Sequence, residues 1–313
     1  MNPLARSLLF VPGDRPDRYA RAVASGAHAV ILDLEDAVAP AAKAQARAEV
    51  VAWLAQGGQG IVRINAADTE WYHEDVQALQ GLEGGEGLPG SEGQGLHGRP
   101  GQQGPGRQVP GQQGQAQQGQ AQQGAPGAGV MLPKADAATV AQTVQALPGR
   151  PIITLLETVR GYMDLHKMAR LPGVARIAFG SVDFAVDSGI ADEGDAMTAI
   201  RTEIVLACRH AGLAAPIDGV SLEFNDPEQM QADARRARQL GFGGKLCIHP
   251  RQVAAVNAAF QPTPSEQDWA RRVLAAFDAS HGAATALDGK MIDKPVVERA
   301  RRIAAESRGA AMA

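Results

Sequence analysis

The chain has 313 residues, 45% of them hydrophobic, and a formal net charge of −4 at pH 7. This length allows a full hydrophobic core, either in one large barrel or in two domains. Because lysines and arginines are scattered along an acidic chain, the composition favours neither nucleic acid nor an anionic membrane surface as a partner. It indicates a protein that acts on small molecules.

The sequence has no feature typical of secreted or membrane proteins. Two cysteines, Cys208 and Cys247, are too few for a disulfide framework and fit a reducing compartment. No small-residue cleavage site follows the short apolar run at the N-terminus, and no run reaches about 18 apolar residues. We therefore expect a cytoplasmic protein without a membrane span.

Strand-like and helix-like segments alternate along the chain. The strand-like runs are apolar almost throughout, which is typical of a parallel sheet covered on both faces. They span 7–13, 29–36, 60–65, 128–134, two runs within 151–184, 216–222 and 244–249. Helical patterns pass through Tyr19 and Val23 and span 40–55, 71–80, 136–147, 161–171, 197–212 and 226–241.

Eight such units predict a closed (β/α)8 TIM barrel over residues 1–260, followed by a C-terminal helical extension over 261–313. The competing fold is a doubly wound open sheet. Against it, no G-x-G-x-x-G follows the first strand and no phosphate-binding loop of the Walker type is present.

One segment differs in composition from the rest of the chain. Between residues 81 and 129, 34 of the 49 residues are Gly, Gln or Pro. Such a segment has too few apolar side chains to offset the entropy lost on ordering. We expect a disordered insertion between two elements that a short loop would otherwise join.

Polar residues collect where the apolar runs end. In a (β/α)8 barrel these carboxyl ends form the active-site face. The residues concerned are Asp14, Arg15, Asp33, Glu35, Asp36, Arg63, Asn65, Lys134, Glu157, Asp183 and His249. Glu157 and Asp183 follow neighbouring strands, which lie about 4.8 Å apart, so both can reach one small hard cation. Alternatively, they are two solvated or salt-bridged acids.

Eight motifs in this order resemble the citrate lyase β-subunit family, which includes CitE-like proteins and malyl-CoA and citramalyl-CoA lyases. The motifs are LFVPGDRPDR, AVILDLEDAV, VRIN, VMLPK, LLETVRG, FGSVDF, KLCIHP and GKMIDKPVVERA. The resemblance covers nearly all of the chain outside 81–129, and the Gly/Gln-rich segment is its one departure.

The resemblance implies a (β/α)8 barrel that binds Mg²⁺ and catalyses reversible carbon–carbon cleavage. The expected reaction converts a β-hydroxyacyl thioester to an acyl or acetyl thioester and an α-oxo acid. The thioester is carried by CoA or by an acyl carrier of a citrate lyase complex. A homotrimer is the expected assembly.

By their motif positions, Glu157 and Asp183 are the expected Mg²⁺ ligands. Arg63 is expected to bind the substrate carboxylate, with Glu157 and Glu35 as further substrate contacts. Glu35 and Asp36 are expected beside the metal, where they orient water or a ligand. The alternative for Arg63 is an ion pair with Asp36 or Glu35. As bare residues, Glu35 and Asp36 could equally be strand-end acids or helix caps.

Asp293 is the expected general base, because the matching aspartate of the family lies in a C-terminal segment that covers a neighbouring subunit's site. The alternative is an N-cap ahead of Lys294. The predicted catalytic set is thus Asp293, Arg63 and Asp36. The residues expected to contact CoA are Phe10, Pro12 and Arg15. His249 precedes a proline, and we expect it to form a structural hydrogen bond and not to bind a ligand.

Two other functions fit the same barrel. An aldolase acting on free hydroxy-oxo acids would use either the metal or a Schiff base, for which Lys134 and Lys245 are the available lysines. A non-catalytic binding or assembly subunit would turn over no thioester at all.

Overall fold

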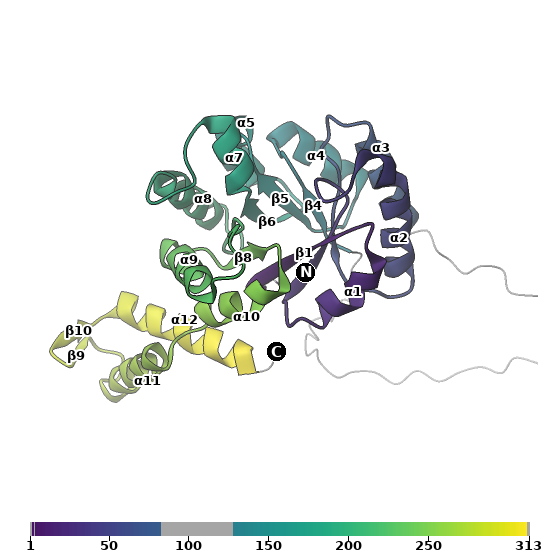
Figure 1. Cartoon of the computed structure of the whole chain (residues 1–313). Coiled ribbons are helices and arrows are strands. Elements are labelled where there is room, and N and C mark those ends of the chain that lie inside the picture. Colours follow the sequence, from purple (N-terminus) through teal and green to yellow (C-terminus); the bar gives the residue numbers. More distant parts are fainter. Residues whose placement is uncertain (1, 3, 83–127, 312–313) are drawn as a thin grey trace, which may run out of the picture.

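The computed structural model describes residue 2, residues 4–82 and residues 128–311. Eight parallel strands form a closed barrel in chain order, with β8 paired to β1 (Figure 1). These strands are β1 (Ser7–Pro12), β2 (Ala29–Asp33), β3 (Ile61–Arg63), β4 (Val130–Leu132), β5 (Ile152–Leu156), β6 (Val174–Phe179), β7 (Ile217–Asp218) and β8 (Gly244–Cys247). The predicted (β/α)8 barrel is confirmed. The insertion expected at 81–129 lies almost wholly outside the described residues.

Helices follow the strands and cover the outside of the barrel. They are α1 (Pro16–Val23), the 3-10 turn η1 (Pro40–Ala42), α2 (Lys43–Ala55), α3 (Trp71–Gly81), α4 (Ala137–Ala146), α5 (Val159–Met163), α6 (Leu165–Met168), α7 (Ser181–Ser188), α8 (Thr198–His210), α9 (Pro227–Leu240) and α10 (Pro250–Ala259). The helix expected over 161–171 is divided into α5 and α6. The sequence analysis did not predict α7, which begins directly after β6.

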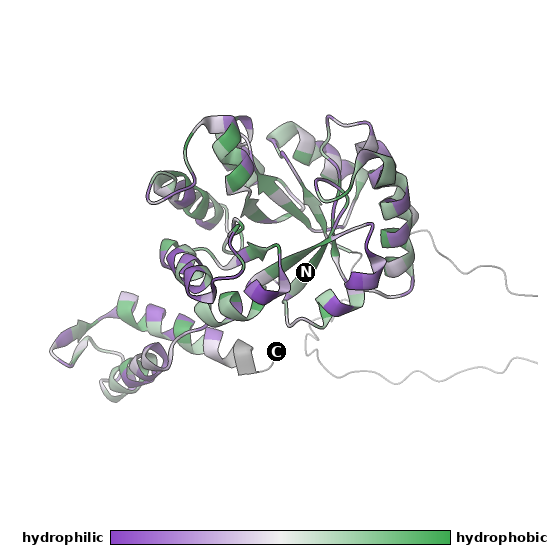
Figure 2. Cartoon of the chain, viewed as in Figure 1, coloured by the Kyte–Doolittle hydropathy of each residue, from purple (hydrophilic) through white to green (hydrophobic). Residues whose placement is uncertain are grey.

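The core has two layers because side chains alternate along each strand. On β5, Ile153 and Leu155 belong to the cluster inside the barrel, whereas Leu156 belongs to the cluster between the barrel and its helices. Figure 2 shows the hydrophobic residues concentrated along the strands and hydrophilic residues on the outer helices. Residues just after a strand therefore point into the mouth of the barrel when they continue the alternation of its inward-facing side chains.

The C-terminal residues form a small unit beside α10 (Figure 1). It consists of α11 (Pro264–Ala279), the antiparallel hairpin of β9 (Thr285–Leu287) and β10 (Lys290–Ile292), and α12 (Lys294–Ala311). The unit has its own apolar cluster, which includes Val273 and Val297. The hairpin was not predicted. Among the described residues, no helix combines the length and the hydropathy that a membrane span requires.

Arg176 helps to close the amino-terminal end of the barrel. Its side chain is 1% exposed and lies on the same side of β6 as Ala178, in the inner cluster. It donates to the carbonyl oxygens of Ala5 at 2.8 Å and Ala215 at 2.9 Å, just ahead of β1 and β7. Because β6 and β7 share a single backbone pairing, this guanidinium ties the strands together where the ladder is weakest.

Replacing Arg176 by Met should lower the free energy of unfolding by about 2–4 kcal/mol, because two buried carbonyls lose their donor. Urea denaturation measures the change. Arg170→Met removes an exposed arginine and serves as the control, with an expected effect within about 0.5 kcal/mol. Equal losses in the two variants would contradict the proposed bracing by Arg176.

Candidate active site

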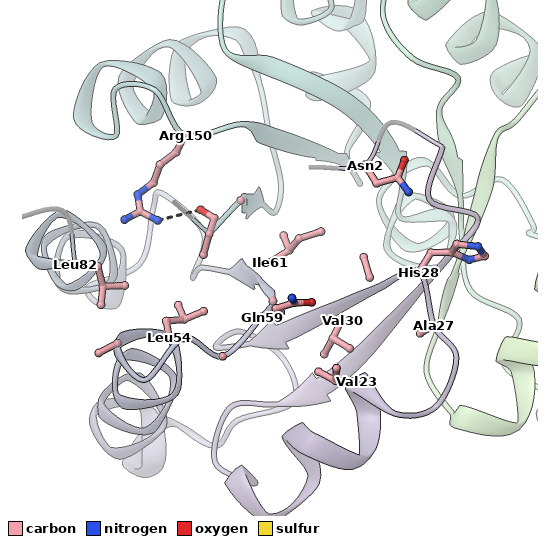
Figure 3. Close-up of a pocket in the computed structure, with 17 residues that line it drawn as sticks. Asn2, Val23, Ala27, His28, Val30, Leu54, Gln59, Ile61, Leu82 and Arg150 are labelled. Carbon is pink, nitrogen blue, oxygen red and sulfur yellow. Dashed lines mark hydrogen bonds between the residues drawn. The ribbon is translucent and has the colours of Figure 1, made fainter. Parts of the chain in front are cut away.

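The structure has hollows at both ends of the barrel. The larger, of about 1070 Å³, lies at the amino ends of β2–β4 and is lined by Gln59, Leu82 and Arg150 among others (Figure 3). Arg150 donates there to the carbonyl oxygen of Ala128 at 2.9 Å. Leu82 and Ala128 flank residues 83–127, so the volume of this hollow is the volume left by the described residues only. The smaller, of about 380 Å³, lies at the carboxyl ends of the strands and is lined by four of the predicted acids, Asp33, Asp36, Glu157 and Asp183.

Arg63 is held at the end of β3 by three acids. Its Nε and Nη2 atoms donate to the two carboxylate oxygens of Asp33, each at 2.6 Å, across the β2–β3 pairing. Its Nη1 atom lies 2.9 Å from Glu35 and 3.3 Å from Asp36. The predicted alternative, an ion pair with Asp36 or Glu35, is therefore present. Burial lowers the Arg63 pKa, but Asp33 and Glu35 outweigh burial and raise it.

Glu35 is a buried acid held between two cations. Its Oε1 atom accepts from Lys134 Nζ at 2.6 Å, while Oε2 faces Arg63. Burial raises the pKa of Glu35, and the positive charge of Arg63 partly offsets the effect. Glu35 does not line the pocket, whereas Asp36 lines it and is largely exposed. Of these two neighbours, Asp36 alone faces the space that a substrate would occupy.

Glu157 follows β5 and is 3% exposed. Its Oε2 atom accepts from the backbone N–H of Lys134 at 2.8 Å. Gly180 makes room for it, because a Cβ atom at position 180 would lie 2.3 Å from Glu157 Cγ. Burial, with the nearby charge of Glu35, raises the pKa of Glu157 to about 8. A negative charge at this position is therefore costly without a compensating cation.

Asp183 lies in the first turn of α7, and the prediction that it follows a strand directly is wrong by a few residues. It is exposed and lines the same pocket as Glu157, whose pKa its charge helps to raise. Helix α7 begins after Gly180, and its first backbone hydrogen bond runs from Phe184 N–H to the Gly180 carbonyl. Ser181 also lines the pocket, and its buried Oγ atom has no hydrogen-bond partner among the described residues.

The donor set fits Mg²⁺. No group of three or more His, Cys, Asp or Glu side chains in the described ranges is arranged to hold a metal ion. However, Mg²⁺ commonly takes one or two protein carboxylates and completes its octahedron with waters and substrate oxygens. Glu157 and Asp183 supply such a pair. The acids in and around the pocket outnumber the cations Arg63 and Lys134; they are Asp33, Glu35, Asp36, Glu157 and Asp183.

The residues expected to contact CoA divide into two groups. Phe10 and Pro12 line the pocket, and the Arg63 guanidinium lies 4.8 Å from the centre of the Phe10 ring. Arg15 does not line the pocket. It lies just before α1 and forms an exposed ion pair with Asp17 at 3.0 Å.

Asp293 lies outside the pocket of its own chain. It precedes α12, where its carboxylate accepts from Val296 N–H at 3.3 Å, as the N-cap alternative predicted. His249 also caps a helix. Its Nδ1 atom accepts from Arg251 N–H at 3.1 Å at the start of α10, and its ring stacks on Phe224. The expected structural hydrogen bond of His249 is confirmed.

The two lysines of the Schiff-base alternative lie in different places. Lys245 is buried and bound to Asp218 at 3.3 Å, and it does not line the pocket. Lys134 lies beside the acids, with Nζ bound to Glu35.

The roles of Asp33, Gly180 and Ser181 were not predicted from the sequence. Of these three, only Asp33 could have been assigned to the pocket from the sequence. It lies two residues after Ile31 on the same strand, so its side chain points inward as that of Ile31 does.

Comparisons with known proteins identify the family of the chain. The HpcH/HpaI aldolase/citrate lyase family matches residues 6–85 and 118–250. A citrate lyase subunit beta-like protein of Deinococcus radiodurans is 32% identical over 96% of each chain. A (3S)-malyl-CoA thioesterase of Cereibacter sphaeroides is 31% identical over 96% of this chain and 94% of its own.

A solved structure shares the fold along almost the whole chain. The CitE protein of Mycobacterium tuberculosis, in complex with magnesium, acetoacetate and coenzyme A, has a TM-score of 0.74 and 30% sequence identity. The alignment covers 98% of this chain and 100% of that one. The predicted resemblance to citrate lyase β-subunits is thereby confirmed. The chain belongs to the HpcH/HpaI aldolase/citrate lyase family, a family of carbon–carbon lyases.

Proposed function

We propose that this chain is a Mg²⁺-dependent lyase that cleaves a β-hydroxyacyl thioester, of the citryl-, malyl- or citramalyl-CoA type, to an acyl thioester and an α-oxo acid. The observation that carries the proposal is that Glu157 and Asp183 line one small pocket at the carboxyl end of the barrel, amid an excess of negative charge. A divalent cation would balance that charge and lower the cost of ionising Glu157.

The chemistry needs three things from the site. The substrate hydroxyl must lose its proton, the carbon–carbon bond must break, and the electron pair must pass to the α-carbon of the thioester. When bound, Mg²⁺ supplies a Lewis acid for the substrate oxygens. Glu157 and Asp183 are the residues that would hold it.

Arg63 and the start of α7 are suited to the substrate carboxylate. The contact of Arg63 with Asp36 is its longest, and the Asp36 side chain is 58% exposed, so a substrate oxygen can take that place. The backbone N–H groups at the start of α7 and the unpartnered Ser181 hydroxyl add donors at the pocket lining. Asp36, once displaced, is left to orient water or ligand. Glu35 positions Arg63 through its ion pair.

In this proposal the general base is Asp293 of a neighbouring subunit in a homotrimer. The C-terminal unit, from α11 to α12, extends beside the barrel, and within one chain it leaves Asp293 outside the pocket. The thioester arm, on CoA or on an acyl carrier, would lie across Phe10 and Pro12 at the mouth. Arg15, exposed ahead of α1, is the proposed partner of a CoA phosphate.

Three alternative functions differ from the proposed lyase. Hydrolysis of the thioester, the activity for which the Cereibacter relative is named, would release a free hydroxy acid and no oxo acid. A Schiff-base aldolase is disfavoured because the hydrogen bond to Glu35 raises the Lys134 pKa against the effect of burial, which leaves a poor nucleophile. A non-catalytic subunit would release nothing.

Isosteric removal of either proposed ligand should abolish the Mg²⁺-dependent reaction. We expect Glu157→Gln and Asp183→Asn each to lower the rate of oxo-acid release by at least about 100-fold, because ligands matter more than the outer-shell groups that tune them. Asp187→Asn changes another exposed acid of α7 outside the pocket and is the matched control. Activity within a few-fold of wild type in either ligand variant would remove the proposed metal site.

Co-expression of Asp293→Ala and Arg63→Ala chains tests whether sites are shared between subunits. In a cyclic trimer with random assembly, about one quarter of the sites would combine an intact Arg63 with a neighbour's intact Asp293. We expect activity near that fraction of wild type, from two parents that are each inactive. Mixed assemblies no more active than the parents would place a complete site within one chain.

A further inference from the structure

The pocket is divided into two halves that follow the strand order. The elements from β2 to α7 contribute the charged side chains. The half formed by β7, β8 and β1 contributes no charged or hydrogen-bonding side chain, and we call it the apolar wall. It consists of Val220, Leu222, Leu246, Ile248, Phe10 and Pro12.

The apolar wall continues into the floor of the pocket. Leu155 and Leu246 also line the pocket and are 2% and 3% exposed, so they lie deep in the barrel. Leu155 lies on β5, two residues before Glu157, and its side chain points to the same side. Its Cα atom is therefore roughly 6.6 Å from the Cα atom of Glu157, deeper in the barrel. By contrast, Leu222 and Ile248 are 65% and 41% exposed at the mouth. A small group bound at Glu157 therefore has leucine side chains beneath it.

The wall is braced by a buried amide. Gln252 is 2% exposed and lies in the first turn of α10, the helix that follows β8. Its Oε1 atom accepts from Ile248 N–H at 2.8 Å, and its Nε2 atom donates to the Ser221 carbonyl at 2.7 Å. These bonds join the segment after β7 to the end of β8. The apolar surface is thus held in place by hydrogen bonds and is preformed.

A second carboxylate would find little support on this side. Arg63 is the sole Lys or Arg among the described residues that line the pocket, and Asp33 and Glu35 already bind it. Burying a carboxylate against leucines without a cationic or hydrogen-bonding partner is costly. The thioester arm is too large for a pocket of about 380 Å³ and must leave through the mouth.

We propose that the α-oxo acid released by this enzyme carries a neutral alkyl group, which lies against the floor and against the part of the apolar wall formed by Val220, Leu222, Leu246 and Ile248. This inference rests on the proposed lyase function. In cleavage, the hydroxyl loses its proton, the bond from the alkyl-bearing carbinol carbon to the thioester α-carbon breaks, and the α-carbon takes a proton. The products are a 2-oxoalkanoate of short chain and the shortened acyl thioester.

The test uses the reverse reaction of the full chain with Mg²⁺ and either acetyl-CoA or propionyl-CoA. The oxo acids are glyoxylate, pyruvate, 2-oxobutyrate and oxaloacetate, which present hydrogen, methyl, ethyl and carboxymethyl to the wall. We expect kcat/KM for pyruvate or 2-oxobutyrate to exceed the values for glyoxylate and oxaloacetate by at least about tenfold. A preference for oxaloacetate or glyoxylate overturns this inference alone. If all four are inert with both thioesters, the proposed lyase function falls, and this inference falls with it.

A matched pair of variants locates the alkyl group. Leu155 and Leu156 are adjacent buried residues of β5, but only Leu155 lines the pocket. Leu155→Val should raise the kcat/KM ratio of 2-oxobutyrate to pyruvate by at least about threefold, because it enlarges the floor. Leu156→Val should leave this ratio within about twofold. Equal shifts, or a shift in Leu156→Val alone, would contradict the placement.

Discussion

Buried negative charge at the carboxyl end of the barrel is the constraint on which the rest of the site depends. Asp33, Glu35 and Glu157 are each at most 5% exposed. Carboxylates so deeply buried must be paired, protonated or bound to a cation. Arg63 satisfies Asp33 completely and Glu35 in part, which leaves Glu157 with a single backbone donor and a pKa near 8.

The fold concentrates this charge because the barrel is built in strand order. The strands from β2 to β6 place Asp33, Arg63, Glu157 and the start of α7 around one side of the mouth, while β1, β8 and the residues after β7 and β8 present apolar side chains to the pocket. The same topology therefore separates a charged side of the pocket, which carries the proposed metal ligands, from an apolar side. Gly180 is a local requirement of this arrangement, because any side chain there would occupy the space of Glu157.

Much of this arrangement could be predicted from the sequence. Apolar runs with helices between them indicated the barrel, and their polar ends indicated Glu157 and Arg63. The helical position of Asp183 could not be predicted, because the residues before it in FGSVDF are mostly apolar or small and are compatible with a strand that continues to the acid. The pairing of Asp33 with Arg63 depends on the lateral register of β2 and β3, and no local pattern encodes it. The proposed role of Asp293 needs a second chain.

The central claim is that Glu157 and Asp183 bind one Mg²⁺ ion. Its most direct test is a calorimetric titration of Mg²⁺ into metal-free protein, in buffers of different ionisation enthalpy. Because the Glu157 pKa is about 8 without metal, its carboxyl is largely protonated at pH 7 and must release that proton to bind a cation. We predict about one ion bound per chain with close to one proton released at pH 7, falling toward none above about pH 9. Absence of saturable binding, or binding at pH 7 without proton release, would contradict the claim.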